Sequence, residues 1–518
     1  MDASCGTVLC YIFFSSIAFV IFTSLFKSLI TRSRNSRTPP SPPTLPIIGH
    51  LHLLGSVIPK SFQALALRHG PLIQLRLGAS TCVVVSNAQV AKEVMKTQEL
   101  NFCCRPQFGS SEYFLYKGSG LITAPYGRYW RFMKKLCVTN LLSSSQLGRF
   151  VHIREQEIKK LLKSLMVCST LGRASDLSFD LTALTNNIMC RMAMSTTCLE
   201  KVNDAEEILG LVREFLHAAA KLSMGEVLGP LGKFDLFGHG KKLVNIVGKF
   251  DRLLERVLEE HEEKNSEARR GQTWDMMDIL LQVSKDPNAD VRLTRNDIKA
   301  FFLDIFLAGT DTSSAALQWA MAEMMNNPRV LRKVKAEIDA VVGSSRLVNE
   351  SDVPNLPYLH AVVKEVLRLH PTAPLALRQS AEDCRINGYD VKGHTRTLIN
   401  VYAVMRDPQA WLNPEEFIPE RFLEGSDGIN RVIAMDGDDF RYLPFGFGRR
   451  RCPGSSLALT VIHVTVASLI QCFEWKIKDG VSMEEGSSFS TGLAKPIVCY
   501  PVTCFNPFEP TFQETTTA

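Results

Sequence analysis

The sequence predicts a mainly α-helical protein with small β-sheets, an α+β fold, and two observations predict it. First, apolar residues recur at spacings of three and four from about residue 88 to residue 370, as in IREQEIKKLLKSLM and VGKFDRLLERVLEEHEEKN. Second, short strand-like runs flank this helical region. One is PLIQLRLGASTCVVVSN, which we expect to form a hairpin around Gly78-Ala79-Ser80, and the others lie between Cys384 and Met405.

The N-terminal segment is predicted to be a transmembrane helix. No charged residue occurs from Ala3 to Phe26, a length sufficient to span a hydrocarbon core of about 30 Å. Lys27 and Arg32 begin a basic stretch after it, which places the rest of the chain in the cytosol. A cleaved signal peptide is the alternative, but it would carry its positive charge before a shorter apolar run.

Five prolines between Pro39 and Pro46 predict a stiff, extended spacer after the basic stretch. We therefore divide the chain into a membrane anchor (1–26), a basic and proline-rich hinge (27–50) and a main domain (51–518).

Composition narrows the functional class. With 518 residues, 45% of them hydrophobic, the chain can bury a large core. A net charge of +6, without a concentrated basic tract, does not indicate nucleic-acid binding. The 14 cysteines lack CxxC pairs and predict a reducing compartment, not a disulfide framework or zinc site. No GxGxxG segment cradles a dinucleotide, so electrons for any redox reaction should come from another protein.

One long helix is predicted between two signals. Thr294 and Asp297 resemble a capping box, and Asn326-Asn327-Pro328 supplies a stop. The small and polar residues of AGTDTSS, in its middle, should loosen the helix because they have lower helix propensity than alanine. This pattern indicates a ligand or water site, and a packing notch is the alternative.

The segment FGFGRRRCPG has an unusual cysteine, Cys452. Glycines and three arginines surround it, as expected for a thiolate that needs positive charge, backbone N–H groups or a metal. Pro453 is favoured at the first position of a helix, so the sulfur should face a helix N-terminus. A buried structural thiol is the alternative interpretation.

Together these segments resemble the cytochrome P450 family. The family's FxxGxRxCxG signature is matched by FGFGRRRCPG, its oxygen-activating helix by AGTDT, its ExxR pair by EVLR, its later arginine by PERF and its WxxxR/K element by WRFMK. The resemblance covers essentially the whole chain and implies the P450 fold with an N-terminal transmembrane helix.

The resemblance also implies roles for individual residues. Cys452 should be the axial thiolate ligand of a haem b iron, and Asp311 with Thr312 should relay protons by way of water as catalytic residues. Further cofactor-binding residues are expected, four of them near the propionates: Trp130, Lys134, Arg378 and Arg450, together with Phe445, Gly446 and Gly448. Glu365, Arg368 and Arg421 should form a buried ionic cluster.

The PPSPP hinge, AGTDTS and HPTAPLALRQSAEDCRINGYDV resemble plant microsomal enzymes of specialised metabolism. The group implied handles flavonoids, isoflavonoids, pterocarpans and, in one branch, oleanane triterpenes. We expect a monooxygenase that hydroxylates a flavonoid or isoflavonoid, while triterpenoid (β-amyrin type) oxidation and flavone synthase-type desaturation remain alternatives. Isoflavone synthases of this group carry Ser and Lys where this chain has Leu307 and Leu377, which favours plain hydroxylation.

Partners and localisation follow from the same resemblance. The enzyme should be a single-pass protein of the endoplasmic reticulum membrane with a cytosolic catalytic domain, using O₂ and NADPH through NADPH-cytochrome P450 reductase. A basic docking face is expected at Arg131, Lys135, Arg449 and Arg451. A haem sensor without turnover is disfavoured by Asp311 and Thr312, and a membrane-anchored scaffold would need no haem.

Overall fold

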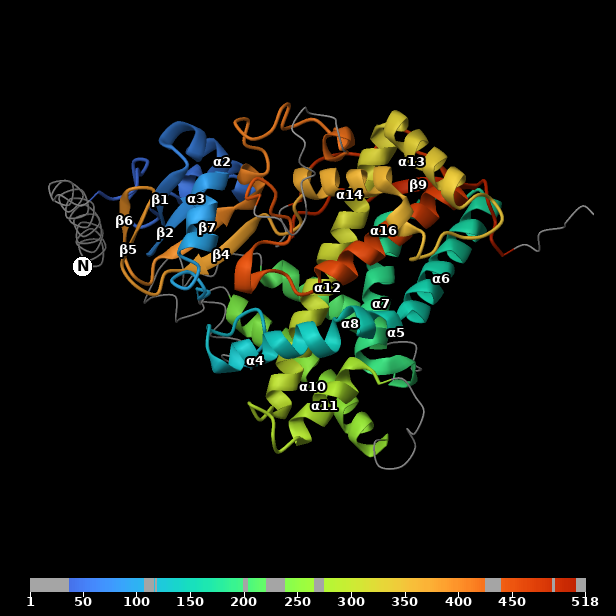
Figure 1. Ribbon diagram of the computed structural model, residues 1–518, viewed down its shortest axis with the longest axis horizontal. Helices are drawn as coiled ribbons and strands as arrows, with labels where there is room; N and C mark the ends of the chain where they lie inside the picture. The colour runs from blue at the N-terminus through green and yellow to red at the C-terminus, as the bar shows by residue number, and fades with distance from the viewer. Residues whose placement is uncertain are drawn as a thin grey trace, which may run out of the picture.

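The computed structural model describes residues 37–106, 116, 119–198, 204–219, 238–264, 274–423, 439–486 and 490–508. The predicted anchor and the first part of the hinge lie outside the described residues. The rest of the hinge lies against the first sheet, where the Gln74 N–H donates to the Pro40 carbonyl at 2.8 Å and the His50 N–H donates to the Arg76 carbonyl at 2.7 Å. Figure 1 shows the β-rich part at the left and the helical body at the right.

The main sheet has four strands in the order β1-β2-β7-β4. Strands β1 (Leu72–Leu77) and β2 (Ser80–Val85) pair antiparallel, which confirms the predicted hairpin. β2 also pairs in parallel with β7 (Arg396–Asn400), and β7 pairs antiparallel with β4 (Leu375–Gln379). The smaller sheets contain β5 (Cys384–Ile386) with β6 (Tyr389–Val391), and β3 (Ser175–Asp176) with β9 (Val498–Thr503) and β8 (Phe473–Lys476).

Helices form most of the described chain and confirm the predicted α+β class. The α-helices are α2 (Ile58–His69), α3 (Ala88–Lys92), α4 (Arg128–Leu136), α5 (Ser144–Arg149), α6 (Val151–Thr170), α7 (Leu177–Cys198), α8 (Asp204–Ala219), α10 (His239–Lys264), α11 (Met276–Lys285), α12 (Arg295–Asn326), α13 (Pro328–Val341), α14 (Pro357–Leu369), α15 (Val401–Val404) and α16 (Ser455–Cys472). Short 3-10 and π segments are η1 (Leu51–Leu53), η2 (Glu93–Thr97), η4 (Cys137–Leu141), η6 (Val353–Asn355), η7 (Pro419–Phe422) and η8 (Gly448–Arg450).

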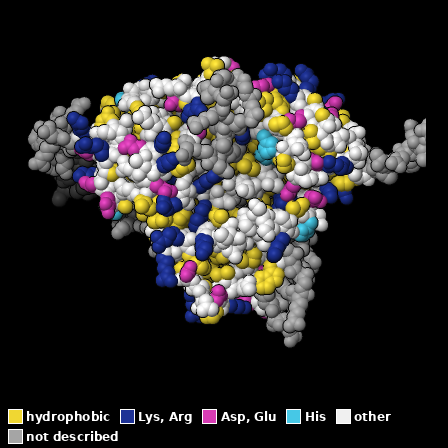
Figure 2. All heavy atoms as spheres, in the orientation of Figure 1, with side chains coloured by type: hydrophobic (Ala, Val, Ile, Leu, Met, Phe, Trp, Pro, Cys, Tyr) yellow, Lys and Arg dark blue, Asp and Glu magenta, His cyan; other side chains and the backbone are white. Residues whose placement is uncertain are grey.

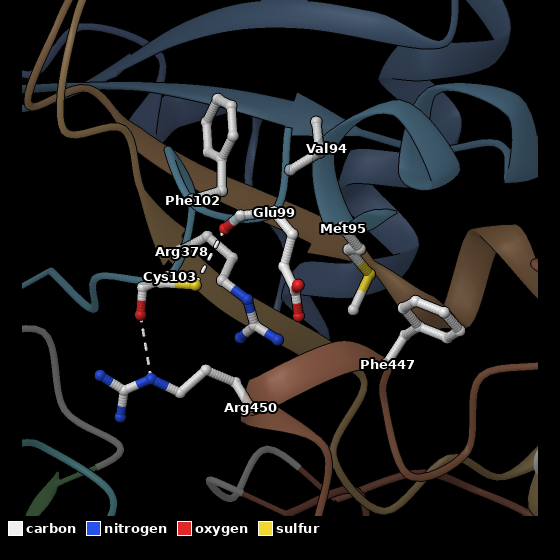
Figure 3. A pocket seen from close by; sticks show the side chains of 8 residues that line it. All are labelled: Val94, Met95, Glu99, Phe102, Cys103, Arg378, Phe447 and Arg450. Carbon is white, nitrogen blue, oxygen red and sulfur yellow. Dashed lines mark hydrogen bonds between the residues drawn. The ribbon is translucent and has the colours of Figure 1, made fainter. Parts of the chain in front are cut away.

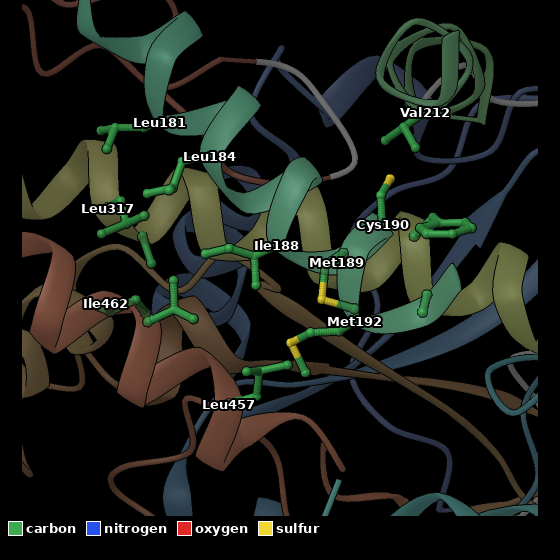
Figure 4. Packing of buried hydrophobic residues seen from close by; sticks show 14 of the residues in the cluster. Leu181, Leu184, Ile188, Met189, Cys190, Met192, Val212, Leu317, Leu457 and Ile462 are labelled. Carbon is green, nitrogen blue, oxygen red and sulfur yellow. The ribbon is translucent and has the colours of Figure 1, made fainter. Parts of the chain in front are cut away.

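The long central helix α12 organises the core. Its capping box between Thr294 and Asp297 is present as predicted. Figure 4 shows apolar side chains of α7 lying between α12 and α16, with Leu184 near Leu317 and Ile462. Because these side chains bury one face of each helix, α12 is fixed at the centre of the molecule.

The predicted loosening of α12 at AGTDTSS is not observed, since the helix is continuous from Arg295 to Asn326. Two hydroxyl groups bond to its carbonyls in this stretch. Thr312 Oγ1 donates to the Ala308 carbonyl at 2.5 Å, and Thr185 Oγ1 of α7 donates to the Thr310 carbonyl at 3.0 Å. The tertiary contact with α7 therefore outweighs the low helix propensity of this stretch.

Among the described residues, α16 is long and apolar enough to cross a membrane. Most of it is buried inside the protein, however, with Val466, Ala467 and Leu469 fully covered. It is a core helix.

Two histidine rings pack together where α14 meets α16. The ring centroids of His360 and His463 are 4.2 Å apart. The Nδ1 of His463 bonds to the Leu459 carbonyl at 2.6 Å, while its Nε2 is buried without a partner in the described part of the chain. Burial, followed by the charge that His360 could carry, lowers the pKa of His463 to about 3.

This pair predicts a pH dependence of stability. The pKa of His463 lies below its ordinary value of 6.5, so the unfolded state binds the proton more readily. Neutral His463 contributes fully to the free energy of unfolding above pH 6.5. This contribution is lost progressively as the pH falls toward 3, by about 1.4 kcal/mol per pH unit. We expect urea unfolding of His463→Leu to show a shallower loss of stability between pH 7.5 and 5.5 than the wild type. His152→Ala is the control, because His152 is exposed. If stability changes with pH equally steeply in His463→Leu and the wild type, the prediction is contradicted.

Candidate functional site

The loop before α16 presents Cys452. The Cys452 N–H donates to the Phe445 carbonyl at 3.0 Å, which closes the loop. Gly446 and Gly448 adopt φ values of 69° and 68°, a left-handed conformation that favours glycine. A Cβ on Gly448 would also collide with the Glu99 carboxylate. The loop geometry therefore explains two of the predicted glycines.

Cys452 is solvent-accessible on one side, although protein surrounds the thiol on the others. Burial raises its pKa, while the Gly454 N–H, Lys134 and Arg451 act in the opposite direction. The sequence suggested that charges and a helix terminus stabilise a thiolate. Burial opposes these stabilising groups, and a metal ion bound to the sulfur would favour the thiolate further.

Buried guanidinium groups gather near this loop. Arg450 donates to the carbonyls of Cys103 and Ala124 at 2.9 and 2.7 Å, and Arg378 donates to its neighbour Leu377 at 2.8 Å. Figure 3 shows the Arg378 and Arg450 side chains extending into the same region, one from β4 and the other from η8. We call Arg105, Arg378 and Arg450 the arginine cluster.

The arginine cluster lacks sufficient negative charge. Burial, and next the positive charge of Arg105, lowers the pKa of Arg378 to about 9 and that of Arg450 to about 10. The Nε atom of Arg105 is buried without a hydrogen-bond partner among the described residues. Buried like charges are unfavourable unless an anion lies between them. The two carboxylates of a porphyrin would supply this negative charge. These residues therefore fit a haem.

Trp130 and Lys134 lie in α4, as predicted, on the side that meets the loop and the arginine cluster. Trp130 Nε1 donates to the Leu121 carbonyl at 3.0 Å, and the guanidinium of Arg450 lies 4.2 Å from the centre of its ring. Lys134 Nζ donates to the Arg451 carbonyl at 2.5 Å, and burial lowers its pKa. The structure thus brings Trp130, Lys134, Arg450 and Cys452 into one region.

The predicted catalytic pair lies on α12. Asp311 accepts a hydrogen bond from the Ser490 hydroxyl, and burial raises its pKa against the effects of Ser490 and Arg213. Thr312 bonds instead to the Ala308 carbonyl of its own helix. The sequence did not identify Ser490 as a site residue, because it lies in a loop near the C-terminus, 179 positions from Asp311.

The apolar residues of α12 from 301 to 308 separate into two groups. Phe301, Phe302 and Phe306 are fully buried in the main hydrophobic core, so packing explains them. Leu307 is partly buried and Ala308 is exposed on the same helix. Only the second group is available to contact a ligand.

The predicted ionic cluster is confirmed. Arg368 donates to both oxygens of Glu365, from Nε at 2.7 Å and from Nη2 at 2.9 Å. Arg421 Nε donates to Glu365 Oε1 at 3.0 Å. Arg368 also donates to the carbonyls of Met405 and Pro414, so the cluster joins α14 to the chain that follows α15. Every side chain of the cluster is buried.

The predicted docking residues differ in their environments. Arg131 and Lys135 are exposed on α4, and Figure 2 shows Lys and Arg side chains gathered over this part of the visible face. Arg449 instead pairs with Glu99, both through its guanidinium and through its N–H, which donates at 2.6 Å. Its charge is therefore largely neutralised within the protein.

Comparison with known proteins gives a consistent result. A family model described as Cytochrome P450 matches residues 39–502. Cytochrome P450 93A3 of Glycine max is 44% identical, with 94% of this chain and 98% of that protein covered. The 3,9-dihydroxypterocarpan 6A-monooxygenase of Glycine max is 43% identical, covering 94% and 98% of the two chains. Beta-amyrin 24-hydroxylase of Glycine max is 42% identical, covering 94% and 97%.

Solved structures support the same fold. A zebra fish cytochrome P450 with abiraterone superposes with a TM-score of 0.73 at 25% identity, covering 87% of this chain and 99% of that one. A second zebra fish structure, with progesterone, has a TM-score of 0.72 at 27% identity, covering 86% and 99%.

The ionic cluster generates a prediction. Arg421→Met should lower the free energy of unfolding by roughly 1.5–3 kcal/mol, because the buried Glu365 carboxylate loses one charge-assisted hydrogen bond and keeps those from Arg368. Arg385→Met, which breaks an exposed ion pair with Asp390, should change stability little. Chemical denaturation of both variants measures the difference, and a similar small loss in each would show that the buried cluster is not a stabilising contact.

Proposed function

We propose, from the fact that this chain belongs to the cytochrome P450 family, that it hydroxylates a flavonoid or isoflavonoid. The coarser function is established: the protein is a haem-dependent monooxygenase of plant specialised metabolism. The observation that carries the substrate class is the 43% identity, over 94% of this chain, to a monooxygenase named for a dihydroxypterocarpan. Apolar Leu307 and Leu377 are compatible with a largely apolar, polycyclic ligand.

A haem bound through a cysteine thiolate activates dioxygen so that one oxygen atom enters a C–H bond. In this chain Cys452 would be the thiolate ligand, presented by the loop of Phe445, Gly446 and Gly448. Arg378 and Arg450 would bind the cofactor's carboxylates with Trp130 and Lys134, because buried cations there lack an anion.

Asp311 and Thr312 would carry protons to the reaction. Burial raises the pKa of Asp311, which favours a group that can take up and release a proton. The Thr312 hydroxyl can donate its proton and be reprotonated by water held near Asp311. Ser490 would orient the Asp311 carboxylate through the hydrogen bond described above.

Electron supply and location complete the proposal. We infer a single-pass protein of the endoplasmic reticulum membrane, since the uncharged stretch from Ala3 to Phe26 is long enough to span it. Electrons would come from NADPH through NADPH-cytochrome P450 reductase, which would approach the exposed Arg131 and Lys135.

A second candidate is oxidation of a β-amyrin type triterpene. The observation that favours it is the 42% identity, over 94% of this chain, to a β-amyrin 24-hydroxylase. The two identities differ too little to separate the substrates, so the experiment must include both.

Product analysis tests the substrate class. Microsomes that contain this protein and a plant reductase are supplied with NADPH and, separately, naringenin, a pterocarpan and β-amyrin. We expect mass spectrometry to show one added oxygen on a phenolic substrate, and none when the reductase or NADPH is omitted. Oxidation of β-amyrin alone would replace the flavonoid proposal with the triterpene one. Product formed without reductase would overturn the proposed electron supply.

The proton relay predicts a coupling defect. Thr312→Ala should lower product formed per NADPH by about 100-fold, because a positioned acid–base group contributes at least that much. Thr312→Ser keeps the hydroxyl and should retain most of the coupling. Product and hydrogen peroxide are measured together for both variants. Equal coupling in Thr312→Ala and the wild type would remove Thr312 from the mechanism.

A further inference from the structure

The central helix carries a second acid, Asp304, which is partly buried and which the sequence analysis did not single out. Its Oδ2 atom accepts hydrogen bonds from the N–H groups of Leu121 at 2.6 Å and Ile122 at 2.9 Å. Both amides belong to the segment that precedes α4, so one carboxylate joins α12 to residues 119–122 (the pre-α4 segment). Hydrogen bonds to a charged acceptor are about twice as strong as neutral ones.

The contact requires a close approach of the backbone. Gly120 adopts φ +93°, and a Cβ there would lie 2.7 Å from Asp304 Oδ2. Any other residue would therefore be strained and would push the segment away from the helix. A glycine with this conformation, placed against this carboxylate, shows that the junction depends on both partners.

The backbone carbonyl of Leu121, in the same segment, contacts two of the proposed cofactor-binding residues. The Leu121 carbonyl accepts from Trp130 Nε1 at 3.0 Å and from Arg450 Nη1 at 3.4 Å. The Leu121 N–H thus donates to Asp304, and the Leu121 carbonyl accepts from two side chains that we propose to bind the cofactor. A shift of this residue would move the acceptor that orients Trp130 and Arg450.

Asp304 also supplies negative charge near the arginine cluster. The pKa of Arg105 is lowered by burial and raised by Asp304, and Arg105 in turn lowers the pKa of Asp304. Burial nevertheless raises the pKa of Asp304 to about 6. The hydrogen bonds from the N–H groups of Ile122 and Leu121 oppose this rise and favour the carboxylate form.

We propose that Asp304 is a positioning residue that fixes the pre-α4 segment and, through the Leu121 carbonyl, orients Trp130 and Arg450 toward the carboxylates of the haem. This inference rests on the proposed cofactor roles of Trp130 and Arg450. The competing explanation is that Asp304 is an ordinary acid that only stabilises the fold. The two explanations predict different results for Asp304→Asn, which has an acceptor oxygen but no charge.

Three variants of the full-length holoenzyme separate these explanations. Asp304→Asn keeps an acceptor oxygen, Asp304→Leu removes it, and Gly120→Ala displaces the segment without changing α12. Glu323→Gln is the matched control, because Glu323 is a buried carboxylate of α12 that bonds to His370 at 2.7 Å, away from this segment.

Two readouts are used that do not depend on substrate turnover. Hydrogen exchange of peptides covering residues 119–122 reports the anchor, and transfer of haem to apomyoglobin reports the cofactor site. We expect exchange and haem loss each to be about tenfold faster in Asp304→Leu and Gly120→Ala, since loss of one charge-assisted bond corresponds to at least that factor. Glu323→Gln should resemble the wild type, and Asp304→Asn should lie between the wild type and Asp304→Leu, because its amide oxygen still accepts the hydrogen bonds but without the charge.

Each contrary result has a defined meaning. Unchanged exchange at 119–122 in Asp304→Leu and Gly120→Ala would overturn the anchor. Faster exchange with unchanged haem loss would overturn its link to the cofactor site. Gly120→Ala gives the same test if Asp304→Leu does not fold. Because amide exchange requires neither substrate nor reductase, failure of this proposal is distinguishable from failure of the proposed reaction.

Discussion

The concentration of buried positive charge beside the Cys452 loop is the constraint on which the rest of the site depends. Arg378 and Arg450 are held by backbone carbonyls and packing, and their pKa values are depressed because burial and mutual repulsion disfavour the charged forms. An anionic ligand would remove this repulsion. If the cofactor's carboxylates occupy this place, as proposed, cofactor binding should contribute directly to the stability of the protein.

The ionic cluster and the arginine cluster both contain buried arginine side chains, but their positive charge is balanced in different ways. In the ionic cluster the Glu365 carboxylate satisfies Arg368 and Arg421, and carbonyls take the remaining donors, so the group is complete without a ligand. The arginine cluster is left incomplete. This contrast distinguishes a structural contact from a binding site more clearly than burial does, because both groups are buried.

The central helix connects these parts with the substrate side. One face of α12 packs on α7, where Ser314 bonds to Thr182 and the Thr310 carbonyl accepts from Thr185. The helix also carries Asp304, Asp311 and Thr312, whose polar atoms bond to the pre-α4 segment, the C-terminal loop and the helix itself. Segments distant in sequence are thus held against one rigid element, as expected when catalytic groups must keep a fixed relation to a cofactor.

The sequence by itself determined the α+β class, the hairpin and the capped central helix, because these depend on local periodicity, capping residues and side-chain types. The ionic cluster was implied by the family resemblance of its motifs. The sequence also predicted that the segment FGFGRRRCPG, which contains Cys452, is a functional site. Only the tertiary structure decided that Phe301, Phe302 and Phe306 belong to the core, that Arg449 is neutralised by Glu99, and that Ser490, Arg105 and Asp304 join the site. The physical reason is that burial, hydrogen-bond partners and the pKa of a side chain are set by neighbours hundreds of residues away, which no local pattern encodes.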